Sequence, residues 1–219
     1  MAAKRTPLMT RDELYEQLRH WHVEAPDAEL NQALDDELWA QLGRTRAVLI
    51  SDLSGFTRIT RTRGILHFLA VFQQAQVLGA KLFERHGGRF LKTAADNLFA
   101  LFDTVGAAAA CAQALLAEAD KLNAGVPSED GHVRFCLGIG YGKIIELADD
   151  AFGDQVNIAF KLGEDVAGQG EILLSEPAVE NLRASTTHQD LVAQLVGPES
   201  EELGRVALHY WTLPLRKRG

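Results

Sequence analysis

Hydrophobic residues recur with a helical period over two long parts of the 219-residue chain. Over 57–86 and from about 104 to 123 they return every three or four positions, which predicts helices that bury one face. A break near Arg63 and Gly64 divides the first part into a short helix followed by a long one. The polar segment 125–131 that follows the second part predicts a loop.

Shorter apolar runs, bounded by glycine or polar residues, predict the strands of a sheet. They cover residues 47–53, 89–93, 98–102 and 133–147. The second and third runs are separated by the four residues 94–97, which predict a hairpin with Asp96 at its turn. The resulting order β-α-α-β-β-α-β predicts a ferredoxin-like α+β fold, an antiparallel sheet with its helices packed on one face.

The C-terminal part carries weaker patterns. We expect a turn at 150–154, a helix over 155–166, a short strand at 171–174, a helix at 177–183, weak strands around Gly197 and Pro198, and an edge strand at 206–212.

The first 44 residues read as a helical segment that precedes the main domain at 45–219. Thr10 and Glu13 form a capping-box pattern, and a second helix carries a leucine at every fourth position before it ends at Gly43. An apolar stripe on a charged helix needs a partner. We expect either packing on the main domain or pairing with a second subunit, so the segment has a dimerisation or a regulatory role.

Charge and composition exclude several classes of protein. The net charge of −8 and the pI near 5.4 argue against a nucleic-acid partner. Two cysteines, Cys111 and Cys136, suggest neither a disulfide framework nor a thiolate metal site. With no apolar stretch of about 18 residues and no leader-like N-terminus, we expect a cytoplasmic protein without membrane insertion. The alternate glycines at 138, 140 and 142 match no phosphate-binding loop.

Two aspartates carry the candidate chemistry. Asp52 ends the first strand and Asp96 lies at the hairpin turn, so the two carboxylates meet if those strands are neighbours. Crowded carboxylates repel, and hard cations such as Mg²⁺ or Mn²⁺ relieve the repulsion. Two such ions suit phosphoryl chemistry, and the amides of the turn at 53–57 suit phosphate oxygens. The alternative is that Asp52 only caps the next helix.

Four segments together carry a pattern that is typical of one protein family. They are residues 50–57 (ISDLSGFT), 92–96 (KTAAD), 152–162 (FGDQVNIAFKL) and 170–175 (GEILLS). In this order they resemble the class III adenylate/guanylate cyclase catalytic domain, over about residues 45–213. The N-terminal helices lie outside the resemblance.

The resemblance implies a role for each matching residue. Asp52, Asp96 and the carbonyl oxygen of Leu53 match the ligands of the two metal ions, and Lys92 and Asp150 match the pair that recognises adenine. Asn157 matches the asparagine that orients the ribose and the reacting phosphate, and Lys161 stands at the position of the transition-state arginine. The phosphate-binding set is then Ser54, Gly55, Phe56, Thr57, Lys143 and Arg205.

The resemblance also implies a reaction and an assembly. An adenylate cyclase converts ATP to 3′,5′-cyclic AMP and pyrophosphate, and uses two Mg²⁺ or Mn²⁺ ions. In this family the site lies between two catalytic domains, so a homodimer with composite active sites is implied, in which Asp52 and Asp96 face Lys92, Asp150 and Asn157 of the other subunit.

Two departures from the family pattern leave alternatives open. Lys161 keeps the positive charge of the expected arginine but loses its planar fork, which predicts slower turnover. Ala95 replaces a glycine beside Asp96, and costs about 1 kcal/mol if the position needs a positive φ. The alternatives are a catalytically weak or inactive domain that binds nucleotide or regulates another protein, or a cyclase for another base.

Overall fold

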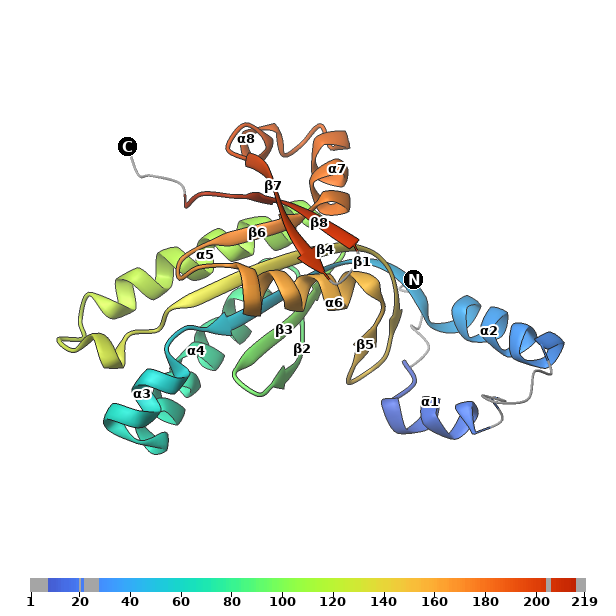
Figure 1. The fold of residues 1–219 in the computed structure, drawn as a ribbon, viewed down its shortest axis with the longest axis horizontal. Coiled ribbons are helices and arrows are strands. Elements are labelled where there is room, and N and C mark those ends of the chain that lie inside the picture. The colour runs from blue at the N-terminus through green and yellow to red at the C-terminus, as the bar shows by residue number, and fades with distance from the viewer. Residues whose placement is uncertain (1–7, 20, 22–27, 204–205, 216–219) are drawn as a thin grey trace, which may run out of the picture.

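We describe the protein from a computed structural model, for residues 8–19, 21, 28–203 and 206–215 (Figure 1). The strands are β1 (Gly43–Leu53), β2 (Arg89–Ala94), β3 (Asn97–Phe102), β4 (Phe135–Glu146), β5 (Ala151–Phe152), β6 (Ile172–Ser175), β7 (Val196–Leu203) and β8 (Val206–Thr212). The helices are α1 (Arg11–Leu18), α2 (Ala28–Leu42), α3 (Phe56–Arg63), α4 (Ile65–Arg85), α5 (Val105–Asn123), α6 (Asp154–Lys161), α7 (Glu176–Ala184) and α8 (Gln189–Val192). A 3₁₀ turn, η1, covers Glu129–Gly131, and a π-helical turn, η2, covers Leu162–Val166.

The strands form one sheet in the order β2-β3-β1-β4-β6-β8-β7, with β5 paired to the end of β4. All pairs are antiparallel except β4 with β6. The predicted order β-α-α-β-β-α-β and the α+β class are confirmed. The strands that carry Asp52 and the Asp96 hairpin are neighbours, since Ile50 of β1 lies opposite Phe99 of β3.

Helices cover both faces of the sheet, so the expectation that all of them lie on one face is wrong. The larger core joins one face, including Leu49 and Phe102, to α4, α5 and α7. On the opposite face, Val48 and Ile50 pack against α6 (Figure 1). The apolar run of β1 is continuous because its alternate residues face two different helical layers.

Two alternate glycines of β4 explain why α6 can lie so close to the sheet. A Cβ atom at Gly138 would overlap the carbonyl oxygen of Ala159, and one at Gly140 would overlap that of Gln155. The helix backbone therefore rests directly on the strand backbone. These glycines belong to the sheet, as expected, and form no phosphate loop.

The N-terminal helices α1 and α2 pack on the main domain. The predicted capping box of α1 is confirmed, because Thr10 donates its amide to the Glu13 carboxylate at 2.7 Å and its hydroxyl accepts the Glu13 amide at 3.3 Å. Leu14 and Leu38 form an apolar cluster with Leu147 at the end of β4. In Figure 1 both helices lie at one end of the sheet, and α2 leads directly into β1.

Several local expectations need correction. The hairpin between β2 and β3 has two loop residues, Ala95 and Asp96, because Ala94 pairs with Asn97. The expected edge strand at 206–212 is β8, which is covered by β7 and therefore lies inside the sheet. The turn at 150–154 contains the short strand β5, and α8 was not predicted. No helix within the described ranges has both the length and the apolarity needed to cross a membrane.

Candidate functional site

Asp52 lies in an acidic cluster at one end of the sheet. It shares the α6 face of β1 with Val48 and Ile50, because residues two apart on a strand point the same way. Burial, followed by repulsion from Asp96 and Glu164, raises the pKa of Asp52 to about 6. The two aspartates predicted as metal ligands are therefore close enough to interact, and the surroundings of Asp52 disfavour its negative charge.

Glu164 belongs to this cluster, although it lies in no pattern of the sequence that marks a functional residue. It lies in the π-helical turn η2, and the side-chain amide of Asn97 donates to its carboxylate. Burial and the nearby Asp165 and Asp96 raise the pKa of Glu164, while the Asn97 hydrogen bond acts in the opposite direction. The Oδ1 atom of Asn97 is buried and has no hydrogen-bond partner among the described residues. A regular helix over 155–166 was expected, and the π-helical turn is what changes the direction of Glu164.

The hairpin that carries Asp96 contains a strained backbone position. Ala95 has φ +53°, the one positive φ of a non-glycine residue in the described part of the chain. Ala95 is the first residue of the two-residue hairpin loop, a position where glycine is the residue that readily adopts a positive φ. The suspected conformational cost of Ala95 is thus present, directly beside a proposed metal ligand.

The turn between β1 and α3 lies next to Asp52. Gly55 has φ +101° and precedes α3 directly, so this turn requires glycine. The amide of Ser54 donates to the carbonyl oxygen of Arg134 at 2.9 Å. Since Ser54 already uses its amide, a phosphate at this turn would depend on the amides of Gly55, Phe56 and Thr57, which start α3.

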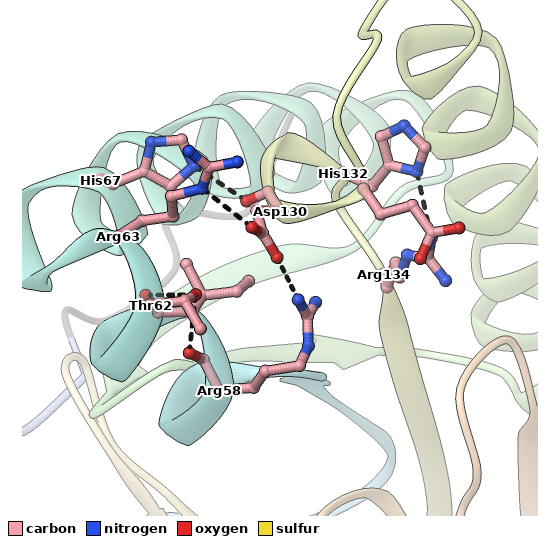
Figure 2. Close-up of polar contacts among 9 residues, drawn as sticks. Arg58, Thr62, Arg63, His67, Asp130, His132 and Arg134 are labelled. Atoms are coloured by element: carbon pink, nitrogen blue, oxygen red, sulfur yellow. Dashed lines mark hydrogen bonds and ion pairs between the residues drawn. The ribbon is translucent and has the colours of Figure 1, made fainter.

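A cluster around Asp130 fixes α3 in place (Figure 2). Arg58 and Arg63 of α3 both bind the Asp130 carboxylate, the latter at 2.9 Å, and His67 of α4 bonds its carbonyl oxygen at 2.9 Å. Hydrogen bonds from Arg63 and Arg58 lower the pKa of Asp130. The segment 125–131, predicted only as a polar loop, therefore anchors α3, the helix that follows the turn at Gly55.

Lys92 and Asp150, the predicted base-recognition pair, form an ion pair within one chain. The Asp150 side chain is 5% exposed, and its Oδ1 atom accepts the amide of Ala151 at 2.8 Å. The preceding turn is braced by Arg89, which donates to the carbonyl oxygens of residues 147 and 148 at 3.0 Å and to buried Glu146 at 3.0 Å. The donor Lys92 on β2 and the acceptor Asp150 on the turn are thus held side by side.

Asn157 and Lys161 lie four residues apart on α6, so they share one face of that helix. Asn157 is exposed. The ammonium of Lys161 is paired with the carboxylate of Asp165 at 2.7 Å, an interaction that the sequence-based interpretation did not include. Lys161 is therefore partly neutralised in this structure.

The remaining predicted cations lie apart from these groups. Lys143 is on the surface of β4, with its ammonium 4.3 Å from the ring centre of Trp39 on α2. Arg205 lies outside the described residues. Asp52 lies opposite Cys136 at the start of β4, whereas Asp150 follows the other end of that strand. The Asp52 cluster and the pair of Lys92 and Asp150 therefore form separate groups in one chain.

The donor set fits a hard divalent cation. Asp52, Asp96 and the Leu53 carbonyl supply only oxygen atoms. The raised pKa of Asp52 reflects burial first and then repulsion from Asp96 and Glu164, and a bound cation would offset both. Across the described ranges, no three acidic, histidine or cysteine side chains form a complete metal site. A Mg²⁺ site needs only one or two carboxylates from the protein, together with water and substrate phosphates.

The chain is similar in sequence to proteins described as adenylate cyclases. The chain is 31% identical over 151 residues to an adenylate cyclase of Streptomyces coelicolor, covering 69% of this chain and 37% of the relative. It is 30% identical over 131 residues to an adenylate cyclase of Streptomyces griseus, covering 60% and 31%. The chain thus spans well under half of either relative. No family model matches it.

Solved structures share the fold. An adenylate/guanylate cyclase/hydrolase from Silicibacter pomeroyi gives a TM-score of 0.64 at 23% identity, over 78% of this chain and 97% of that one. The adenylyl cyclase CyaB from P. aeruginosa gives 0.63 at 16% identity, over 80% and 97%. The catalytic core of a rhodopsin-guanylyl cyclase with converted specificity, in complex with ATPαS, gives 0.63 at 16%, over 80% and 99%. The resemblance to adenylate and guanylate cyclase catalytic domains is confirmed, and the fold is theirs.

Proposed function

We propose that this chain is a nucleotidyl cyclase, most specifically an adenylate cyclase that converts ATP to 3′,5′-cyclic AMP and pyrophosphate. The observation that carries the proposal is the meeting of Asp52 and Asp96 at the ends of neighbouring strands, on the face covered by α6. The adenylate cyclase names of the relatives at about 30% identity support the same reaction.

The metal-binding residues in this proposal are Asp52, Asp96 and the carbonyl of Leu53. When bound, two Mg²⁺ or Mn²⁺ ions supply the positive charge that activates the ribose 3′-oxygen and balances the triphosphate. In the reaction the 3′-oxygen bonds to the α-phosphorus, the bond from that phosphorus to the bridging oxygen of pyrophosphate breaks, and the 3′ proton leaves to water.

The chain's own residues bind and orient the nucleotide. Lys92 donates to a ring nitrogen of adenine while Asp150 accepts from its amino group, which gives the preference for adenine. Asn157 orients the ribose, and Lys161 meets the charge that develops on the phosphate. Lys143, Arg205 and the turn from Ser54 to Thr57 contact the remaining phosphates.

We propose that the active form is a homodimer with two composite sites. The support is that the acidic cluster and the pair of Lys92 and Asp150 form separate groups in one chain. In a head-to-tail dimer, the acidic cluster of one subunit faces the base-recognition residues Lys92 and Asp150 of the other.

A second candidate function is a nucleotide-binding domain with little turnover. Two observations favour it: the ion pair that holds Lys161 on Asp165, and the strained Ala95 beside Asp96. Either feature weakens the stabilisation of the transition state, while Lys92 and Asp150 remain in place to bind the base.

One assay separates the two candidates. The purified chain is incubated with Mn²⁺ and each of the four ribonucleoside triphosphates, and cyclic product is separated by chromatography. We expect cyclic AMP from ATP, little product from the others, and none from Asp52→Asn. Binding of ATP without any cyclic product would leave only the second candidate.

A further inference from the structure

The N-terminal helices contact two residues of the proposed substrate site. Arg11, the first residue of α1, lies with its guanidinium 3.6 Å from the Asp150 carboxylate. Trp39 of α2 lies under the ammonium of Lys143 at 4.3 Å. Asp150 is the predicted acceptor for the adenine amino group, and Lys143 is a predicted ligand of the triphosphate. The helices α1 and α2 that contact them lie outside the cyclase resemblance.

The position of Arg11 is set by backbone contacts. The Arg11 amide donates to the Asp149 carboxylate at 2.9 Å, and the amide of Ala148 donates to the carbonyl oxygen of Met9 at 2.8 Å. Asp149 thus caps α1 from the turn that carries Asp150. The start of this helix and the base-recognition turn are joined directly.

Arg11 competes for an oxygen atom that the base would need. Oδ2 of Asp150 is already bound by Lys92 and also faces Arg11, while Oδ1 accepts the Ala151 amide. An adenine amino group must donate to one of these two occupied oxygens. Since the Arg11 side chain is 48% exposed, its ion pair is weak and can be displaced.

An open cavity of about 450 Å³, lined mainly by apolar side chains including Leu14, Leu38 and Trp39, lies between α1, α2 and Ile145 of β4. Beside it, the apolar cluster of Leu14, Leu38 and Leu147 holds the helices on the domain. The contacts of Arg11 and Trp39 are the ones that reach the proposed substrate site.

We propose that Arg11 and Trp39 are affinity-determining residues of the cyclase site, which occupy Asp150 and Lys143 until nucleotide displaces them. This inference rests on the proposed function. Each contact is worth up to about 1 kcal/mol, so removing one lowers the KM for ATP by about two- to fivefold. The value of kcat changes little, because neither residue contacts the reacting atoms.

The test compares KM and kcat for ATP with Mn²⁺ in the full chain and four variants. Arg11→Ala and Trp39→Leu are expected to lower KM, and Arg11→Lys to stay near the unmodified chain because it keeps the charge. Arg19→Ala is the matched control, since it removes an arginine of the same helical segment that pairs with Glu16 instead. Tm is measured for each variant to confirm folding.

The outcomes separate this inference from the proposed function. If the unmodified chain forms no cyclic nucleotide, the proposed function fails and this inference falls with it. If the chain is active and Arg11→Ala leaves KM unchanged, Arg11 does not set affinity and the inference alone is overturned. A raised KM in a folded Arg11→Ala chain also overturns it, because Arg11 would then hold Asp150 in its productive position.

Discussion

Replacing Ala95 with glycine should stabilise the protein and strengthen its response to metal. Ala95 is exposed, so its methyl group gains little from packing, and its φ of +53° places it in the left-handed region. That conformation costs an L-residue about 1–2 kcal/mol. Glycine removes this cost, but its greater conformational entropy stabilises the unfolded chain by about 0.4–1 kcal/mol. The net gain in unfolding free energy is about 1 kcal/mol, or about 2–4 °C in Tm for a chain of this size.

The assay is thermal unfolding of the metal-free protein, with Ala94→Gly as the control. Ala94 pairs with Asn97 at the end of β2, where glycine only loses strand order and should cost about 0.5–1 kcal/mol. The Mn²⁺ concentration needed for half-maximal activity should fall in Ala95→Gly, because the relaxed turn lets Asp96 settle on the metal. A Tm that drops as far in Ala95→Gly as in Ala94→Gly would refute the strain argument.

Three further predictions concern the charged groups. Lys161→Arg should raise kcat about tenfold by restoring a forked donor to the developing phosphate charge; an unchanged or lower kcat would contradict that role. Asp52→Asn should raise the metal-free Tm at pH 8, because it removes a charge that is buried and repelled by Asp96 and Glu164, and it should abolish the Tm gain on adding Mn²⁺; a gain that persists places the metal elsewhere. Since the pKa of Asp52 is raised to about 6, its charge opposes folding increasingly as pH rises from about 4 through 6. Protons should therefore compete with Mn²⁺ for Asp52 as pH falls below about 6, and the Mn²⁺ concentration that gives half-maximal activity should rise. A half-maximal concentration that stays constant from pH 8 to 5 would argue against this competition.

The central sheet could be predicted because its strands are short, continuous apolar runs. β1 and β3 are buried on both faces, and such runs are hard to mistake when glycine or polar residues bound them. The turn at Gly55 and the break at Gly64 were equally plain, because only glycine readily adopts their positive φ. That Asp52 and Asp96 lie close together depended on β1 and β3 being neighbours, a pairing that the structure supplies.

Other features depend on contacts between distant segments, which local patterns do not encode. Glu164 reaches the acidic cluster through a π-helical turn that carries no distinctive residue. Asp130 lies in a segment with the composition of an ordinary polar loop, and only the fold brings two arginines of α3 onto its carboxylate. The placement of α6 on the opposite face was missed for the same reason, since the glycines that admit it read simply as residues of a strand.

The seating of α6 on β4 has a mechanical consequence. Because Gly138 and Gly140 leave no side chain between the two backbones, the helix has no layer on which to roll or slide. We therefore expect the backbone of Asn157 and Lys161 to move together with the sheet. In the proposed homodimer, a regulator that alters their position relative to bound nucleotide would then rotate one subunit against the other instead of shifting this helix alone.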